Sequence, residues 1–246
     1  IMKITHLLIT AGLLFSFLLL PSCLDDDGSN WNKLYPNALV TVKHASDETV
    51  FFQLDDKTTL LPLNLQPSIF DSKEVRALVN YNEVDEPSKQ YDKAVHVNWI
   101  DSIRTKPMAP NLGDKNKDEY GDDPVEIVRD WVTIAEDGYL TLRFRTYWRY
   151  SRVVHYVNLI PTNNPENPYE VEFFHDANGD YADRKGDGLV AFKLDKLPDT
   201  NGETVKLKLK WKSFSGEKSV EFDYQTRAET SVAGAFSDVR NELPLK

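Results

Sequence analysis

The chain has 246 residues, with 39 Asp and Glu against 29 Lys and Arg, and a formal net charge of −10 at pH 7. Binding to nucleic acid depends on clustered basic side chains that neutralise phosphates, so this charge argues against a nucleic-acid partner. Hydrophobic residues make up 41% of the chain, including 12 Phe, 11 Tyr and 5 Trp, which is enough to build a sizeable core.

The first 22 residues are predicted to be a secretory signal peptide. Lys3 is followed by an uncharged apolar run from Leu7 to Leu20, "LLITAGLLFSFLLL". This run is too short to span a bilayer, which takes about 20 residues, and a basic start before a short apolar core is typical of a secretory signal. A buried core helix fits less well, because no polar face interrupts the run.

Cys23 is the only cysteine of the chain and follows this apolar run closely. A single cysteine cannot form an internal disulfide, so in an exported protein it is either a free thiol or a modified residue. The stretch "LPSC", with Leu20 and Ser22 before Cys23, resembles the bacterial lipobox, in which the cysteine is acylated and becomes the first residue of the mature protein. Two or three acyl chains hold a protein stably on a membrane. Cys23 is therefore predicted to be a permanent membrane tether.

Residues 23–33 are predicted to form an acidic tether. Asp25, Asp26 and Asp27 come just after the cysteine, and carboxylates are repelled by anionic head groups. Acidic residues in this place resemble the export signal that sends lipoproteins of some Gram-negative anaerobes to the outer face of the outer membrane. The protein is therefore expected to be lipid-anchored in the outer membrane and exposed on the cell surface. The alternative is an ordinary solvated linker.

Alternation of apolar and polar residues with a period of two dominates the rest of the chain. In "TVKLKLKW", Thr204 to Trp211, the apolar residues point to one side of a strand and three lysines point to the other. A strand with one buried and one charged face is typical of an antiparallel sheet. The same alternation occurs in "ALVTVKH", "EVRALVNY", "AVHVNWI", "GYLTLRFRTYW", "YEVEFFHD" and "SVEFDYQT". Helical spacing is scarce, apart from a turn near "SIFDSKEV", so the predicted fold class is all-β.

One segment divides the predicted strands into two groups. Residues 106–124, "KPMAPNLGDKNKDEYGDDP", contain three prolines and two glycines, and proline cannot donate a hydrogen bond within a central strand. This segment is either a domain linker or one long loop, and we place the domain boundary near residue 117. The strands on either side match a small barrel over residues 34–117 and an antiparallel β-sandwich over residues 118–246.

Four segments between residues 120 and 194 carry a family resemblance: "GDDPVEIVRDWVTIAEDGYLTLRFRTYW", "VVHYVNLI", "EVEFFHDANGD" and "GLVAFKL". They resemble the NigD-like lipoproteins. In that family an OB-like domain precedes a C-terminal β-sandwich behind a lipoprotein signal, so the resemblance implies an OB-like barrel in the N-terminal half. The family takes its name from a protein of a bacteriocin gene cluster that was proposed to confer immunity, and most relatives have no assigned activity.

Residues 176–187, "DANGDYADRKGD", have a spacing similar to that of a calcium-binding loop. Asp176, Asn178, Asp180 and Asp187 occupy positions 1, 3, 5 and 12, where such loops supply oxygen ligands. However, Tyr181 occupies position 6, where the sharp turn requires glycine. We therefore predict a solvated loop between two strands, with Asn178 and Gly179 as the residues that tolerate a positive φ. No metal and no cofactor is predicted.

The sequence offers little support for catalysis. The histidines beyond the signal contain no His-x-x-x-His pair, and the chain has no Gly-x-Ser-x-Gly motif. His155 shares the face of an alternating strand with Val157 and Leu159, which predicts a core histidine with a hydrogen-bond partner. His96 alternates with valines and is predicted to face outward or towards a neighbouring strand. The protein is not expected to be an enzyme.

An aromatic cluster suggests a ligand. Tyr147, Trp148 and Tyr150 lie at the end of a predicted strand, and aromatic faces can stack on pyranose rings. The alternative is that one aromatic face belongs to the core and the other rings cover a hairpin beside Arg149 and Arg152. Two hypotheses therefore remain: a surface-tethered binding module with a bacteriocin-immunity-like role and a protein ligand, or an accessory glycan-binding lipoprotein. An exposed aromatic platform would favour the glycan. A flat acidic patch opposite a basic toxin would favour immunity, because charge complementarity governs encounter.

Overall fold

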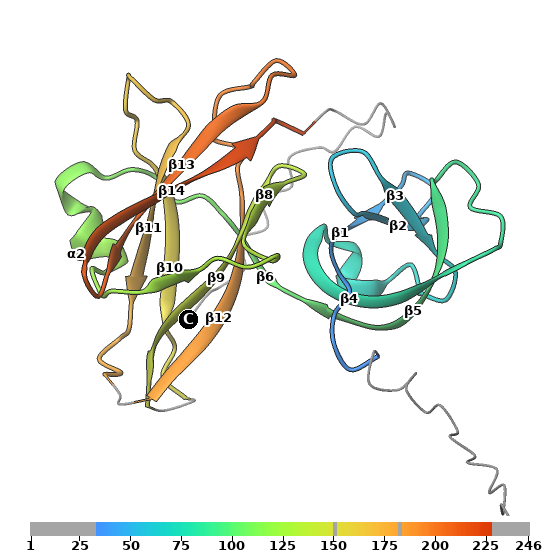
Figure 1. Cartoon of the computed structure of the whole chain (residues 1–246), viewed down its shortest axis with the longest axis horizontal. Coiled ribbons are helices and arrows are strands. Elements are labelled where there is room, and N and C mark those ends of the chain that lie inside the picture. The colour runs from blue at the N-terminus through green and yellow to red at the C-terminus, as the bar shows by residue number, and fades with distance from the viewer. Residues whose placement is uncertain (1–32, 150–151, 182–183, 228–246) are drawn as a thin grey trace, which may run out of the picture.

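The computed structural model describes residues 33–149, 152–181 and 184–227. Strands dominate these residues, in two all-β domains joined in sequence (Figure 1). The predicted class is therefore confirmed, and the seven alternating segments quoted above all fall on strands. The predicted turn near residue 70 is a short 3-10 helix, η1 (Ile69–Ser72).

The N-terminal domain is a closed five-stranded barrel with the strand order β1-β2-β3-β5-β4. Four of the neighbouring pairs are antiparallel, and β3 and β5 are parallel. Alternate side chains fill its interior, among them the fully buried Val40, Phe52 and Val95. The strands are β1 (Ala38–His44), β2 (Val50–Gln53), β3 (Thr59–Pro62), β4 (Val75–Val84) and β5 (Lys93–Ser102).

The C-terminal domain is a sandwich of two sheets. One sheet has the order β10-β11-β13-β14, and the other has the order β6-β12-β9-β7, with β8 paired to β9. Most neighbours are antiparallel, whereas β6–β12 and β11–β13 are parallel. The elements are β6 (Arg104–Pro107), η2 (Gly113–Lys115), α2 (Asn116–Tyr120), β7 (Glu126–Val128), β8 (Ile134–Glu136), β9 (Tyr139–Trp148), β10 (Tyr156–Pro161), β11 (Glu170–Asp176), β12 (Arg184–Lys193), β13 (Val205–Ser213) and β14 (Gly216–Tyr224).

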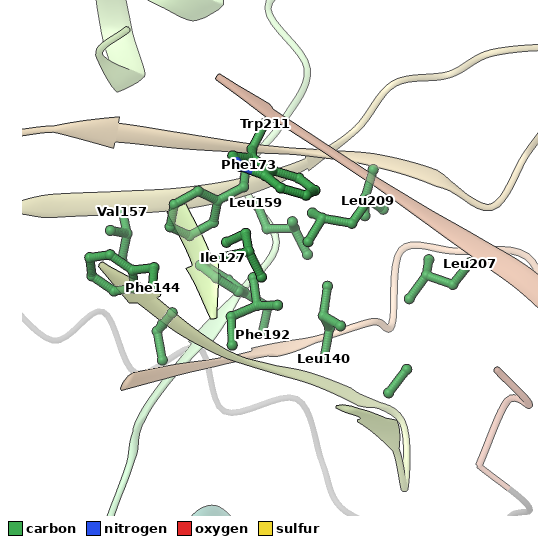
Figure 2. Close-up of a cluster of buried hydrophobic side chains, with 14 of the residues drawn as sticks. Ile127, Leu140, Phe144, Val157, Leu159, Phe173, Phe192, Leu207, Leu209 and Trp211 are labelled. Carbon is green, nitrogen blue, oxygen red and sulfur yellow. The ribbon is translucent and has the colours of Figure 1, made fainter. Parts of the chain in front are cut away.

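The sandwich core lies between the inner faces of the two sheets. Leu140 and Phe192 come from one sheet, and Phe173 and Trp211 come from the other, so that the side chains interdigitate (Figure 2). Phe144 needs the glycine opposite it on β12, because a Cβ on Gly188 would lie only 2.5 Å from its ring. The glycines of β12 are thus required by the large aromatic side chains of β9 that cover them.

The chain passes from the barrel to the sandwich between Ser102 and Arg104, earlier than the predicted boundary near residue 117. Strand β6 begins at Arg104 and pairs with β12 over four positions, so it belongs to the sandwich. The proline-rich segment after β6 is not a linker, because it packs on the sandwich. Its α2 helix buries Tyr120, whose hydroxyl donates to the carbonyl of Pro110 and whose ring packs on Phe174.

The two domains share a buried contact around the β8–β9 hairpin. Asp137 and Gly138 form its two-residue turn, both with positive φ (49° and 73°), as a type I′ turn requires. Asp137 is 3% exposed and accepts hydrogen bonds from Lys43 of β1 at 2.8 Å and from Arg227. Arg227 also pairs with Glu74. Burial lowers the pKa of Lys43, and Asp137 opposes this effect.

A second charged pair lies in the same contact. Arg76 of β4 is fully buried, and its guanidinium donates to Glu136 of β8 at 2.8 Å and to Thr41 of β1 at 3.0 Å. Apolar side chains surround the pair, namely Leu39 and Ile103 of the barrel together with Val132, Tyr139 and Ala191 of the sandwich. Buried charges are tolerated only when they are paired and hydrogen-bonded. The domains are therefore held together by specific contacts as well as by their covalent connection.

Candidate partner-binding face

The aromatic cluster at the end of β9 is divided between the two faces of the sheet. Side chains of a strand alternate, and the buried positions of β9 include Leu142 and Phe144. Trp148 lies on this inner side, packed over Gly186 of β12, whereas Tyr147 lies on the outer side. Tyr150 lies outside the described residues. Tyr147 and Trp148 therefore do not share one platform, because neighbouring residues of a strand point in opposite directions.

On the inner side, Trp148 covers a hydrogen-bonded pair of histidines. Its ring stacks on His155, with centroids 4.2 Å apart, and His155 stacks in turn on His175. The Nδ1 atom of His155 lies 2.9 Å from Nε2 of His175, and its Nε2 atom lies 3.4 Å from the Asp180 carboxylate. The prediction that His155 is a buried histidine with a partner is confirmed, since its side chain is only 2% exposed.

Burial makes the protonated form of His175 unfavourable. Desolvation, followed by repulsion from His155, lowers the pKa of His175 to about 4. At neutral pH only one proton can lie between the two facing nitrogens. If both were protonated, two N–H groups would face each other in an apolar environment.

Asp180 joins the two loops that close this end of the sandwich. Both oxygens of its carboxylate accept the backbone N–H of Arg149, each at 3.0 Å, and the same carboxylate lies beside His155. Arg149 belongs to the β9–β10 connection and Asp180 to the β11–β12 connection. The buried carboxylate thus holds the end of β9, including Tyr147, in a defined position.

The remaining residues of the calcium-like spacing do not converge. Asp176 accepts the backbone N–H of Asn178 in a local turn, and Asp187 lies on β12, paired with Arg145 of β9. Asn178 and Gly179 have positive φ, as predicted for the loop. Within residues 33–149, 152–181 and 184–227, no group of three or more His, Cys, Asp or Glu side chains is arranged to hold a metal ion.

On the outer side, charged and aromatic residues form an exposed surface. Arg145 donates two hydrogen bonds to Asp187, at 2.6 and 2.9 Å, and these bonds hold the pKa of Asp187 below its usual range. The Tyr147 ring meets Phe214 edge-on at 5.1 Å, and the Lys185 ammonium lies over the same ring at 5.5 Å. We call this surface the sandwich face; it consists of Trp131, Arg143, Arg145, Tyr147, Lys185, Asp187 and Phe214.

The composition of the sandwich face suits a protein ligand. Tyr, Trp and Arg are the residue types that dominate binding energy in protein interfaces. Trp131 is 52% exposed and Phe214 is 40% exposed, while Arg143 is held by Asp130 at 2.6 Å. The carboxylates pre-order the arginines, so that less side-chain entropy is lost when a partner binds.

Other predicted site residues lie elsewhere or outside the described part. Cys23, Asp25, Asp26 and Asp27 fall outside the described residues, so their roles stay predictions. His96 is exposed on β5, as predicted. Sequence reasoning missed His175, Lys185 and Phe214, because each becomes part of the site only through pairing of strands that are distant in sequence.

Comparison with protein families matches most of the chain. Residues 39–103 match the NigD-like N-terminal OB domain, and residues 107–224 match the NigD-like C-terminal β-sandwich domain. The chain belongs to the NigD-like family. The two NigD-like domains meet between residues 103 and 107, where the structure also changes from barrel to sandwich. A search of curated proteins found no match.

Solved structures share this fold. A protein from Parabacteroides distasonis, described as toxin-related, is 35% identical, with a TM-score of 0.65 over 77% of this chain and 92% of that chain. A protein of unknown function from Bacteroides vulgatus is 21% identical, with a TM-score of 0.62 over 82% and 95% of the two chains. A NigD-like immunity protein from Bacteroides caccae is also 21% identical, with a TM-score of 0.52 over 75% and 90%.

None of these descriptions names an enzymatic activity. In the part of the chain that the structure describes, no helix is both long and apolar enough to cross a membrane.

Proposed function

We propose that this NigD-like protein is a non-enzymatic, surface-tethered lipoprotein that binds a peptide toxin and protects the cell that carries it. The observation that carries the proposal is its family membership, together with 35% identity to a protein described as toxin-related. The description of the Bacteroides caccae structure as an immunity protein agrees with this role. The anchor would be the acylated Cys23, and Asp25, Asp26 and Asp27 would direct the protein to the surface.

The sandwich face would be the binding surface for the toxin. It carries Arg143, Arg145 and Lys185 against the single carboxylate of Asp187, so it is not the acidic patch expected for a basic toxin and suits a neutral or acidic peptide. The exposed Trp131 and Phe214 and the half-buried Tyr147 supply the large, rigid contact area of interface hot spots. Arg145 is held by two hydrogen bonds and can offer its guanidinium without large rearrangement. Below this face, the network of Asp180 and His155 keeps the strand end rigid.

The glycan-binding alternative loses its main support in the structure. It requires neighbouring aromatic rings on one face, whereas Trp148 is packed inside the sandwich over Gly186. Stacking on a sugar ring would have to use single exposed rings, which gives a weaker platform than the sequence indicates.

Deletion of the gene in the host bacterium tests the proposal. The deletion strain is challenged with a panel of purified peptide bacteriocins from related bacteria, and sensitivity is measured as the minimal inhibitory concentration. We expect increased sensitivity to at least one peptide, restored by the parent protein and not by Cys23→Ser, which cannot be acylated. Unchanged sensitivity to the whole panel, or full protection by Cys23→Ser, would contradict a tethered immunity role.

A further inference from the structure

The first described residues run across the outside of the barrel. The indole N–H of Trp99 on β5 donates to the carbonyl of Lys33 at 2.5 Å, and Asn80 on β4 donates to the carbonyl of Tyr35 at 2.7 Å. Two residues later, the backbone N–H of Asn37 joins β4 through the carbonyl of Val79. Figure 1 shows this segment in blue, looping past β4 before it enters β1. Residues 33–37 are thus fixed to the barrel by hydrogen bonds from two of its strands.

Two consecutive apolar side chains project from this segment. Leu34 is 63% exposed and Tyr35 is 69% exposed, although the backbone that carries them is hydrogen-bonded on both sides. Single exposed apolar residues are common and need no explanation. Here, however, two adjacent ones are exposed on a fixed backbone, and the half-buried Trp99 binds the carbonyl of the residue before them.

The outer side of the barrel next to this segment is rich in amides and poor in charge. Asn82 and Asn98 are exposed there, and Asn98 donates to Asn80 at 2.7 Å. The register of β4 and β5 places Asn80 opposite Trp99 and Asn82 opposite His96, so these positions contain no Asp, Glu, Lys or Arg. Asp101 comes two pairs further along, opposite Leu78, where the sandwich begins. In a protein with a net charge of −10, a surface without carboxylates is not repelled by anionic head groups.

The position of this surface in the chain suggests what covers it. Ten residues separate Lys33 from Cys23, and a fully extended chain of that length reaches at most about 35 Å. Acyl chains on Cys23 would therefore keep Leu34 and Tyr35 near the bilayer at a high effective concentration. Trp and Tyr prefer the interface between head groups and acyl chains, and a lysine beside them can extend its ammonium into water.

We propose that this surface rests on the lipid bilayer. We call it the tether face and define it by Lys33, Leu34, Tyr35, Asn82, Asn98 and Trp99. Leu34 enters the boundary between head groups and acyl chains, the Tyr35 ring lies at head-group level, and the amides face the hydrated head groups. The proposal rests on the proposed anchoring at Cys23, because two apolar side chains alone bind a membrane too weakly to hold a protein. The barrel then lies against the membrane in a fixed orientation.

The experiment uses the single cysteine as a chemical tether. The chain from Cys23 onward is coupled through its thiol to a maleimide lipid in phosphatidylcholine vesicles that contain a brominated phosphatidylcholine. Contact with the bilayer is measured as quenching of tryptophan fluorescence by the bromine atoms. We expect quenching for the parent protein, and at least a twofold loss of that quenching when Leu34→Glu and Tyr35→Glu are combined, because two carboxylates cannot enter the interface.

Tyr181→Glu is the matched control, because Tyr181 is 68% exposed, as much as Tyr35, but lies on the sandwich. It should leave the quenching unchanged. Equal quenching in the parent and in the Leu34→Glu, Tyr35→Glu variant, with both folded by circular dichroism, would overturn the proposal. So would quenching that a lipid-free polysaccharide abolishes by competition, since the tether face would then bind a glycan and not the bilayer. Thiol coupling replaces acylation, so failure here is distinct from full protection of the deletion strain by Cys23→Ser, which would contradict the proposed function.

Discussion

The ammonium of Lys43 lies 2.8 Å from the carboxylate of Asp137, and this ion pair joins the barrel to the turn of the β8–β9 hairpin. Both side chains are nearly inaccessible, with 8% and 3% exposed, and Asp137 also receives Arg227 at 2.9 Å. One carboxylate thus pairs with a buried lysine and with a partly exposed arginine that also binds Glu74. The NigD-like barrel and sandwich are therefore expected to unfold together.

Asp137→Ala should destabilise the whole protein. It leaves the buried Lys43 and the partly exposed Arg227 without this partner, and breaking a buried pair costs about 3–5 kcal/mol. Urea denaturation followed by tryptophan fluorescence measures the loss. The control is Asp195→Ala, which removes a half-exposed partner of Lys193 at 3.8 Å and should change stability by less than about 1 kcal/mol. A small effect of Asp137→Ala, or two separate transitions in the parent protein, would show that the domains are energetically independent.

The pair of Arg76 and Glu136 should show strong coupling in a double-mutant cycle. Arg76→Met leaves Glu136 without its main partner in a partly buried site and should cost about 3 kcal/mol or more. Adding Glu136→Leu should recover most of that loss, because well-packed apolar residues can replace a buried ion pair at little cost. The unfolding free energies of the parent, the two single variants and the double variant give the coupling energy between Arg76 and Glu136. Additive losses would mean that each side chain acts through other contacts.

Stability should fall as the pH drops from 6.5 towards 4. The pKa of His175 is lowered from 6.5 to about 4, so the unfolded state binds a proton that the folded state refuses in this range. Each unit corresponds to about 1.4 kcal/mol, which gives a loss of about 3 kcal/mol attributable to this histidine. Denaturation at pH 7 and pH 4.5 is compared for the parent and for His175→Phe, whose dependence on pH should be shallower. If the parent and His175→Phe lose stability equally between pH 7 and pH 4.5, the pH dependence comes from a group other than His175.

Calcium should not change the thermal stability. Asp187 on β12 is engaged by Arg145, and Asp180 by the backbone N–H of Arg149. These carboxylates therefore cannot gather around one ion without breaking these contacts. An ion at a hundredfold excess over its Kd would stabilise by about 2.7 kcal/mol. Melting curves in millimolar calcium and in chelator should coincide. A shift of more than about 4 °C that Asp176→Ala abolishes would establish a metal site.

Much of the fold follows from the local pattern of the sequence. Alternation with period two predicts strands such as β13, because a half-buried strand needs one apolar and one polar side. The domain boundary was harder to predict. Prolines mark irregular structure, but the sequence does not show that the four residues of β6 pair with β12, more than eighty positions later.

The site was harder to predict than the strands, because its contacts are not local. Asp137 lies 94 positions from Lys43, and Arg145 lies 42 positions from Asp187. Pattern alone indicates that Tyr147 and Trp148 belong to one strand. It also implies that they point to opposite faces, which agrees with the alternative that one aromatic face of this segment belongs to the core. The proximity of His155 to His175 depends on the pairing of β10 with β11.

Protection by variants of the sandwich face tests the proposed function most directly. The deletion strain is complemented with the parent protein, with the double variant Arg145→Glu and Tyr147→Glu, or with Tyr156→Glu, a 41% exposed tyrosine on the opposite sheet. Surface amounts are matched by antibody labelling, and sensitivity is measured for the bacteriocin to which the deletion strain is sensitive. Hot-spot residues contribute about 2 kcal/mol or more each, so the double variant should lose at least about tenfold in protection, whereas Tyr156→Glu protects fully. Full protection by the Arg145→Glu, Tyr147→Glu variant would contradict the role of the sandwich face in binding the toxin.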